Sequence, residues 1–177
     1  MEIDPLLAAI SFAARAHRHQ VRKDGQTPYV AHVYRVAMIL RHLFGVTDPK
    51  VLTAAVLHDT IEDTTTDFDE IAEAFGPDVA TWVVALTKDK RLPEAEREEA
   101  YGKQLAAGGL PVCLCKLADV YDNLTDSRAM PAEKRAKTVA NARRYLAVFR
   151  PNLPAEARAA FALVEAKLAE AAAGMTA

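Results

Sequence analysis

The chain has 177 residues, a length that fits one domain at roughly 150 residues per domain. Hydrophobic residues make up 51% and charged residues 26%, the balance of an ordinary globular protein. The 22 basic and 24 acidic residues give a formal net charge of −2, which argues against a general nucleic-acid-binding protein but allows a local basic patch.

Apolar residues recur at helical spacing through the first half of the chain. They predict helices over 5–19, about 30–43, about 49–62, 68–75 and 77–87, separated by loops with glycine, proline or capping residues. The first segment lacks the basic region and cleavage pattern of a signal peptide. No apolar run approaches the ~20 residues that span a membrane, so we expect no membrane partner and a cytoplasmic location.

A charged, proline-interrupted stretch over 88–98 follows, to which we assign no function. Further helices are predicted over about 94–107, 111–127, about 131–149 and, in an alanine-rich segment, about 154–173. Cys113 and Cys115 are too few for a disulfide framework or a zinc site, so we expect both in the core. Because no segment alternates with period two, the predicted fold is all-α, one helical domain over 1–177.

The segment AAVLHDTIEDTT concentrates groups that can carry chemistry. On a helix, residues i and i+4 share a face, so Glu62 is expected near His58 and Asp63 near Asp59. Three carboxylates and an imidazole in so short a space repel one another unless a cation is present. Imidazole and carboxylate ligands together suit Mn²⁺, Fe²⁺ or Mg²⁺ better than structural zinc.

Two residues elsewhere are candidate ligands of the same ion. His32 opens the second predicted helix, and Asp119 interrupts an apolar helix, where an aspartate is rarely buried unless it is paired or ligating. Each feature alone has an ordinary explanation: His-Asp dipeptides are common on surfaces, and a histidine at a helix start is often only hydrogen-bonded. The combination in one helical chain favours a metal site.

Four motifs follow one another in the chain: AARAHRHQVRKDGQTPYVAH, AAVLHDTIEDT, FGPDVATWVVALTK and KLADVYDNLTD. In this order they resemble the HD superfamily of metal-dependent phosphohydrolases, whose fold is a helical bundle. The resemblance extends to its (p)ppGpp hydrolase group, which contains the hydrolase domains of Rel/Spo-type enzymes and the stand-alone small alarmone hydrolases. It covers about residues 8–150.

The resemblance implies roles for individual residues. One divalent ion, Mn²⁺ in most of the family, would be held by His32, His58, Asp59 and Asp119. The residues that position and deprotonate the attacking water would be Glu62 and Asp63. Substrate would be contacted by Arg22, Lys23, Asn123 and Tyr145.

The implied reaction is Mn²⁺-dependent removal of the 3′-diphosphate from guanosine 3′,5′-bis(diphosphate), a small nucleotide, giving GDP or GTP and pyrophosphate. The chain departs from the family pattern at Val120 and Asn141, where basic residues are usual. Two alternatives therefore stay open: an HD phosphohydrolase of another nucleotide ester, such as a nucleoside monophosphate or NADPH, and a non-catalytic sensor of nucleotide or alarmone. The oligomeric state is also open.

Overall fold

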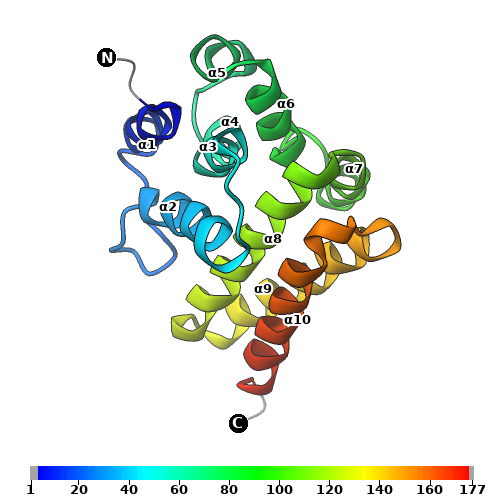
Figure 1. Ribbon diagram of the computed structural model, residues 1–177. Coiled ribbons are helices and arrows are strands. Elements are labelled where there is room, and N and C mark those ends of the chain that lie inside the picture. The colour runs from blue at the N-terminus through cyan, green and yellow to red at the C-terminus, as the bar shows by residue number, and fades with distance from the viewer. Residues whose placement is uncertain (1–3, 176–177) are drawn as a thin grey trace.

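Side-chain caps start several of the helices in the computed structural model, which describes residues 4–175 (Figure 1). Asp4 accepts a hydrogen bond from the backbone N–H of Leu6 and precedes a proline at the first position of α1 (Pro5–Ala16). Asp48 caps α3 (Pro49–Leu57) in the same way. Helix α1 ends at Ala16, three residues earlier than the predicted helix over 5–19.

The helices between and after these follow the predicted order. α2 (Val30–Met38) continues into a π-helical turn at Ile39–Leu43. Asp67 and Glu70 form a reciprocal capping box at the start of α5 (Phe68–Phe75). The remaining α-helices are α4 (Thr60–Asp63), α6 (Pro77–Leu86), α7 (Glu94–Ala107), α8 (Gly109–Asp126), α9 (Ala132–Phe149) and α10 (Arg158–Ala173). Short 3-10 turns lie at Ser127–Ala129, Arg150–Asn152 and Ala155–Ala157.

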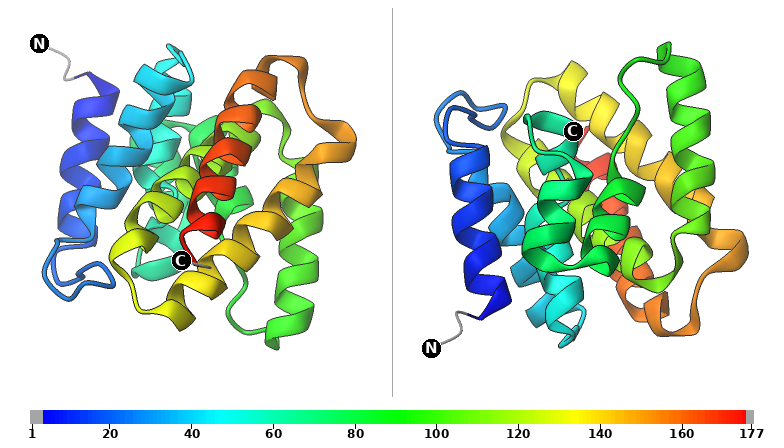
Figure 2. Two further views of the ribbon diagram at one scale, coloured as in Figure 1. Left: turned by 90° about the horizontal axis from the view of Figure 1, so that it is seen from below. Right: turned by 90° about the horizontal axis from the view of Figure 1, so that it is seen from above.

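Helix α8 is the centre of the molecule. It packs against α2, α3, α6, α7, α9 and α10, and Figures 1 and 2 show it crossing between the N-terminal and C-terminal helices. Its buried side chains include Cys113 and Cys115, as predicted, and also three charged ones, Lys116, Asp119 and Asp122. Burying charged side chains is costly unless they pair with one another or hold an ion, so these three residues are candidates for a functional site.

The all-α prediction is confirmed. Residues 4–175 contain no β-strand, and their one strand-like pairing is an isolated bridge between Val21 and Pro28. Among the same residues, no helix combines the length and apolar composition that crossing a bilayer requires.

The prediction of one continuous helix over 49–62 is wrong at His58 and Asp59, two of the candidate metal ligands. Helix α3 ends at Leu57, α4 begins at Thr60, and His58 and Asp59 occupy the turn between them. The Thr60 hydroxyl donates to the Leu57 carbonyl at 2.7 Å, a side-chain bond that competes with the helical hydrogen-bond ladder. The Asp63 N–H still donates to the Asp59 carbonyl at 2.9 Å, so the expected proximity of these two residues is retained.

Candidate functional site

Two histidines and two aspartates converge at the break between α3 and α4. Donor atoms of His32, His58 and Asp59 all lie within 4.8 Å of one another. Asp119 Oδ1, on α8, lies 3.2 Å from His32 Nε2 and 3.9 Å from His58 Nε2. Helices α2 and α8 and the α3–α4 turn therefore bring together all four residues that the sequence resemblance proposes as ligands.

The hydrogen bonds of both imidazoles suit metal binding. His58 Nδ1 lies 2.8 Å from the Ala55 carbonyl, which can only accept, so this nitrogen carries the proton. His58 Nε2 is buried, lies 3.0 Å from Asp59 Oδ2, and makes no well-aligned hydrogen bond with the described residues. His32 Nδ1 lies 2.7 Å from a carboxylate oxygen of Asp122, which leaves its Nε2 facing Asp59 and Asp119. Two nitrogen and two carboxylate donors fit a divalent first-row metal ion.

The electrostatics of the cluster keep its carboxylates ionised. Although burial opposes it, the neighbouring imidazoles of His58 and His32 hold the pKa of Asp59 well below its usual value. Burial also opposes ionisation of Asp119, but the ammonium of Lys116 and the imidazoles lower its pKa. Burial lowers the pKa of His32, but hydrogen bonds to aspartates outweigh it and raise this pKa to about 10. Metal binding must therefore displace protons from the imidazoles.

Tyr29 joins the proposed ligand Asp59 to Asp63. Its hydroxyl lies 2.6 Å from Asp59 Oδ2 and 3.3 Å from Asp63 Oδ2, and it has one proton to donate. The His17 ring stacks on the tyrosine at 4.8 Å between centroids. No role was predicted for Tyr29, although it stands in the motif AARAHRHQVRKDGQTPYVAH, three residues before His32.

Glu62 and Asp63 have different surroundings. Glu62 Oε2 accepts the Lys88 N–H at 2.9 Å, and no described residue donates to its other oxygen. Burial, with the charges of Asp59 and Asp63, raises the pKa of Glu62. Asp63 accepts a hydrogen bond from the Lys90 ammonium at 2.5 Å, and the Tyr29 hydroxyl lies 3.3 Å from its other oxygen. Of the two, Glu62 is the better placed to exchange a proton with a bound water.

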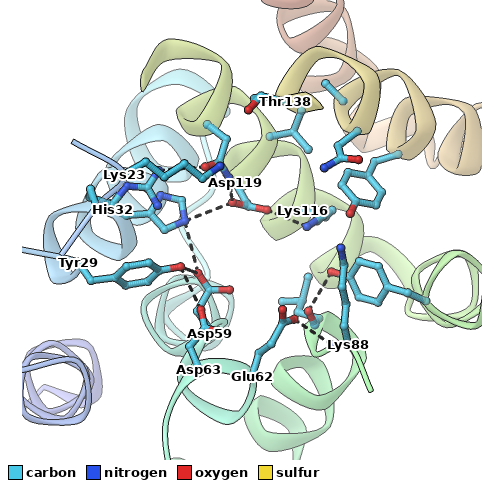
Figure 3. Close-up of a pocket in the computed structure, with 18 of the residues that line it drawn as sticks. Lys23, Tyr29, His32, Asp59, Glu62, Asp63, Lys88, Lys116, Asp119 and Thr138 are labelled. Atoms are coloured by element: carbon cyan, nitrogen blue, oxygen red, sulfur yellow. Dashed lines mark hydrogen bonds and ion pairs between the residues drawn. The ribbon is translucent and has the colours of Figure 1, made fainter. Parts of the chain in front are cut away.

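A cavity of about 370 Å³ opens beside the four converging residues. Its lining contains every site residue predicted from the sequence except His58. Figure 3 shows His32, Asp59 and Asp119 on one side of this space and Glu62 and Lys88 on another, all pointing inward. This volume is in the range of small-molecule sites.

Two lysines and two tyrosines form the wall away from the histidines. Lys116 lies 5.2 Å from the centre of the Tyr101 ring and 4.4 Å from that of Tyr145, and Lys88 lies 5.1 and 5.4 Å from the same rings. Lys116 also pairs with Asp119 at 2.8 Å. No role was predicted for Lys88, although it is the last residue of the motif FGPDVATWVVALTK.

The predicted substrate-contacting residues of the first loop and of α8 differ in whether other residues already bind their polar groups. Arg22 is bound to Asp126 at 3.0 Å and to Asn123 Oδ1 at 2.9 Å. The Asn123 amide in turn donates to Asp119 at 2.5 Å. Lys23 is exposed and makes no ion pair with the described residues. Lys23 is therefore free to meet an anion, whereas Arg22 and Asn123 also brace Asp119.

Comparisons with known proteins agree with this geometry. The family model described as HD domain matches residues 9–152. A human protein named guanosine-3′,5′-bis(diphosphate) 3′-pyrophosphohydrolase MESH1 is 48% identical over 126 residues, covering 71% of this chain and 70% of that protein. An Aquifex aeolicus protein named guanosine-3′,5′-bis(diphosphate) 3′-pyrophosphohydrolase is 40% identical over 132 residues, covering 73% of this chain but 18% of that protein.

Solved structures extend the similarity to nearly the whole chain. One is described as "A metazoan ortholog of SpoT hydrolyzes ppGpp and plays a role in starvation responses"; it has a TM-score of 0.82, 33% identity, and coverage of 98% of this chain and 97% of that one. A second, lmo0812 from Listeria monocytogenes, has a TM-score of 0.68 and 27% identity, covering 81% of this chain and 97% of that one. The chain therefore belongs to the HD-domain family, in the branch that contains the MESH1 hydrolases.

Proposed function

We propose that this protein is a divalent-metal-dependent (p)ppGpp 3′-pyrophosphohydrolase that uses Mn²⁺. The observation that carries the proposal is the convergence of His32, His58, Asp59 and Asp119 at the edge of a nucleotide-sized cavity with lysines on its far wall. The names of the relatives support the same substrate.

A divalent ion held by the four ligands would polarise a phosphate oxygen and lower the pKa of a bound water. Glu62 would take the proton of the attacking water, because its raised pKa and its unengaged oxygen suit a general base. Asp63 would hold Tyr29 and Lys90 and so orient the turn that carries Asp59. Lys116 would keep Asp119 in place through its ion pair.

The lysine and tyrosine wall supports a nucleotide as the substrate. Ammonium groups neutralise phosphates, and tyrosine rings offer a surface for a base or a sugar. Tyr145 is predicted to line the nucleotide pocket, and the centre of its ring lies 5.4 Å from the Lys88 ammonium and 4.4 Å from that of Lys116. The phosphate to be cleaved would lie on the histidine side and the rest of the nucleotide toward this wall.

One observation favours another nucleotide ester as a second candidate substrate. Val120, which replaces the basic residue usual in the family, lies in the cavity lining and is 5% exposed, so it faces the substrate space. The cavity thus lacks one cation that the family pattern supplies. We place (p)ppGpp before NADPH or a nucleoside monophosphate because the relatives are named for its hydrolysis.

The test is product release from metal-stripped protein reloaded with Mn²⁺. We would offer ppGpp, pppGpp, NADPH and a panel of nucleoside monophosphates side by side, and measure pyrophosphate and orthophosphate separately. We expect Mn²⁺-dependent pyrophosphate from ppGpp and pppGpp. Orthophosphate from another compound would move the substrate to the second candidate, and binding of ppGpp without any product would indicate a sensor.

A further inference from the structure

The side of the His32 ring that faces away from the proposed metal position contacts an aspartate on α8. Asp122 Oδ2 lies 2.7 Å from His32 Nδ1, and the two side chains are 2% and 1% exposed. Asp122 lies three residues after Asp119, so one turn of α8 carries both a proposed ligand and this contact to another ligand.

An arginine holds this aspartate at both of its oxygens. Arg35 Nε donates to Asp122 Oδ1 at 2.6 Å, and Arg35 Nη2 donates to Oδ2 at 2.9 Å. Arg35 follows His32 by three residues on α2, so the histidine and the arginine reach the same carboxylate from one helix face. A two-pronged arginine–carboxylate pair fixes the plane of the carboxylate as well as its position.

The two proposed histidine ligands are therefore held in different ways. The His58 ring donates to the carbonyl of Ala55, three residues earlier in its own segment and electrically neutral. The His32 ring meets an ionised acceptor that lies 90 residues away in the sequence and belongs to the central helix. A carboxylate partner on the outer nitrogen fixes the tautomer of a ligating histidine and strengthens it as a donor.

We propose that Asp122, oriented by Arg35, is a positioning residue that keeps the proton of His32 on Nδ1 and directs Nε2 toward the divalent ion. The inference rests on the proposed metal site but not on the identity of the substrate. Asp122 itself cannot be a ligand to the same ion in this arrangement, because it contacts the opposite nitrogen of the ring.

The chain supplies a matched control one turn further along α8. Asp126 Oδ2 accepts hydrogen bonds from Arg22 at 3.0 Å and from Arg35 at 2.8 Å, so it belongs to the same charged network. It contacts none of the proposed metal ligands among the described residues. Replacing either aspartate by asparagine removes one negative charge from the same helix face, but only the change at Asp122 alters the partner of His32.

The experiment compares Mn²⁺ affinity of the metal-free wild-type protein, Asp122→Asn and Asp126→Asn by calorimetric titration. We expect Asp122→Asn to bind Mn²⁺ about 10–100-fold more weakly, as for other partners of ligating histidines, and Asp126→Asn to stay close to wild type. An asparagine that turns its oxygen to His32 must turn its NH₂ toward Arg35, so one of the two contacts is lost. Thermal unfolding of each metal-free variant checks that the fold is kept.

A kinetic measurement separates positioning from a loss of structure. In Asp122→Asn, the Mn²⁺ concentration for half-maximal hydrolysis should rise by the same factor as the dissociation constant, while kcat at saturating Mn²⁺ falls much less. Equal weakening in both variants, or unchanged affinity in Asp122→Asn, would overturn the inference. If the wild-type protein binds Mn²⁺ but releases nothing from ppGpp, the proposed substrate fails, and the affinity comparison still decides the role of Asp122.

Discussion

The adjacent acids Glu62 and Asp63 allow a sharp test of the proposed mechanism. Changing either one to its amide removes a single negative charge from α4 and hardly alters the shape of the side chain. If Glu62 takes the proton from water, Glu62→Gln removes that step entirely. Asp63→Asn removes an ion pair with Lys90, and its amide oxygen can still accept the Tyr29 hydroxyl.

The expected magnitudes differ because the two contacts differ. Loss of a general base costs about 10²–10⁴-fold in rate, which is about 3–5 kcal/mol at ~1.36 kcal/mol per tenfold. The Lys90 side chain is 53% exposed, and an ion pair with such a partner contributes about 0.2–1 kcal/mol, or less than about tenfold. We therefore expect Glu62→Gln to lose at least about ten times more activity than Asp63→Asn.

The assay is the initial rate of pyrophosphate release from ppGpp at saturating Mn²⁺, with kcat and KM determined for both variants. Calorimetric titration with Mn²⁺ establishes that each variant still binds the ion, so that a lost ligand is not mistaken for a lost base. Equal losses in the two variants, or a larger loss in Asp63→Asn, would refute the assignment of the base to Glu62.

Three further changes address the ion, the base and the lysine wall. Asp59→Ala should abolish both Mn²⁺ binding and turnover, and full activity in this variant would end the metal mechanism. Because the pKa of Glu62 is raised above 4.5 and protonated Glu62 accepts no proton, kcat should fall as the pH drops through that raised pKa. This fall in kcat at low pH should be absent from the residual activity of Glu62→Gln. Lys88→Met should raise the KM for ppGpp about 10–100-fold, the loss of one charge-assisted contact, with kcat changed less; an unchanged KM would remove Lys88 from the substrate site.

The sequence predicted the helices well because their signals are local. Apolar periodicity and capping residues such as Asp4 and Asp67 depend on neighbours within one or two turns, and the structure retains them. The break before Thr60 could not be read in the same way, because the apolar pattern continues across it. There the Thr60 hydroxyl bonds to the Leu57 carbonyl, a side-chain contact that periodicity does not reveal.

The site was only partly predictable for a related reason. The residues proposed as ligands stand in motifs, and the structure brings them together, although their roles stay predictions. Lys88 and Asp122 also stand in motifs, but their contacts are defined by partners far away in the chain: the Tyr145 ring in one case and His32 in the other. Contacts between helices that are distant in sequence produce no periodic pattern in the sequence of either helix.

The charge balance of the cavity links the proposed ion to the proposed substrate. The lining contains four carboxylates, on Asp59, Glu62, Asp63 and Asp119, and four cationic side chains, on Arg22, Lys23, Lys88 and Lys116. Before metal binding the His32 imidazole carries a second proton, because its pKa is about 10, so the lining has one net positive charge. A divalent ion that displaces this proton raises the net positive charge of the lining by one, and in a partly buried space that charge is weakly screened. Metal and nucleotide should therefore bind with positive coupling, each raising the affinity for the other by the same factor.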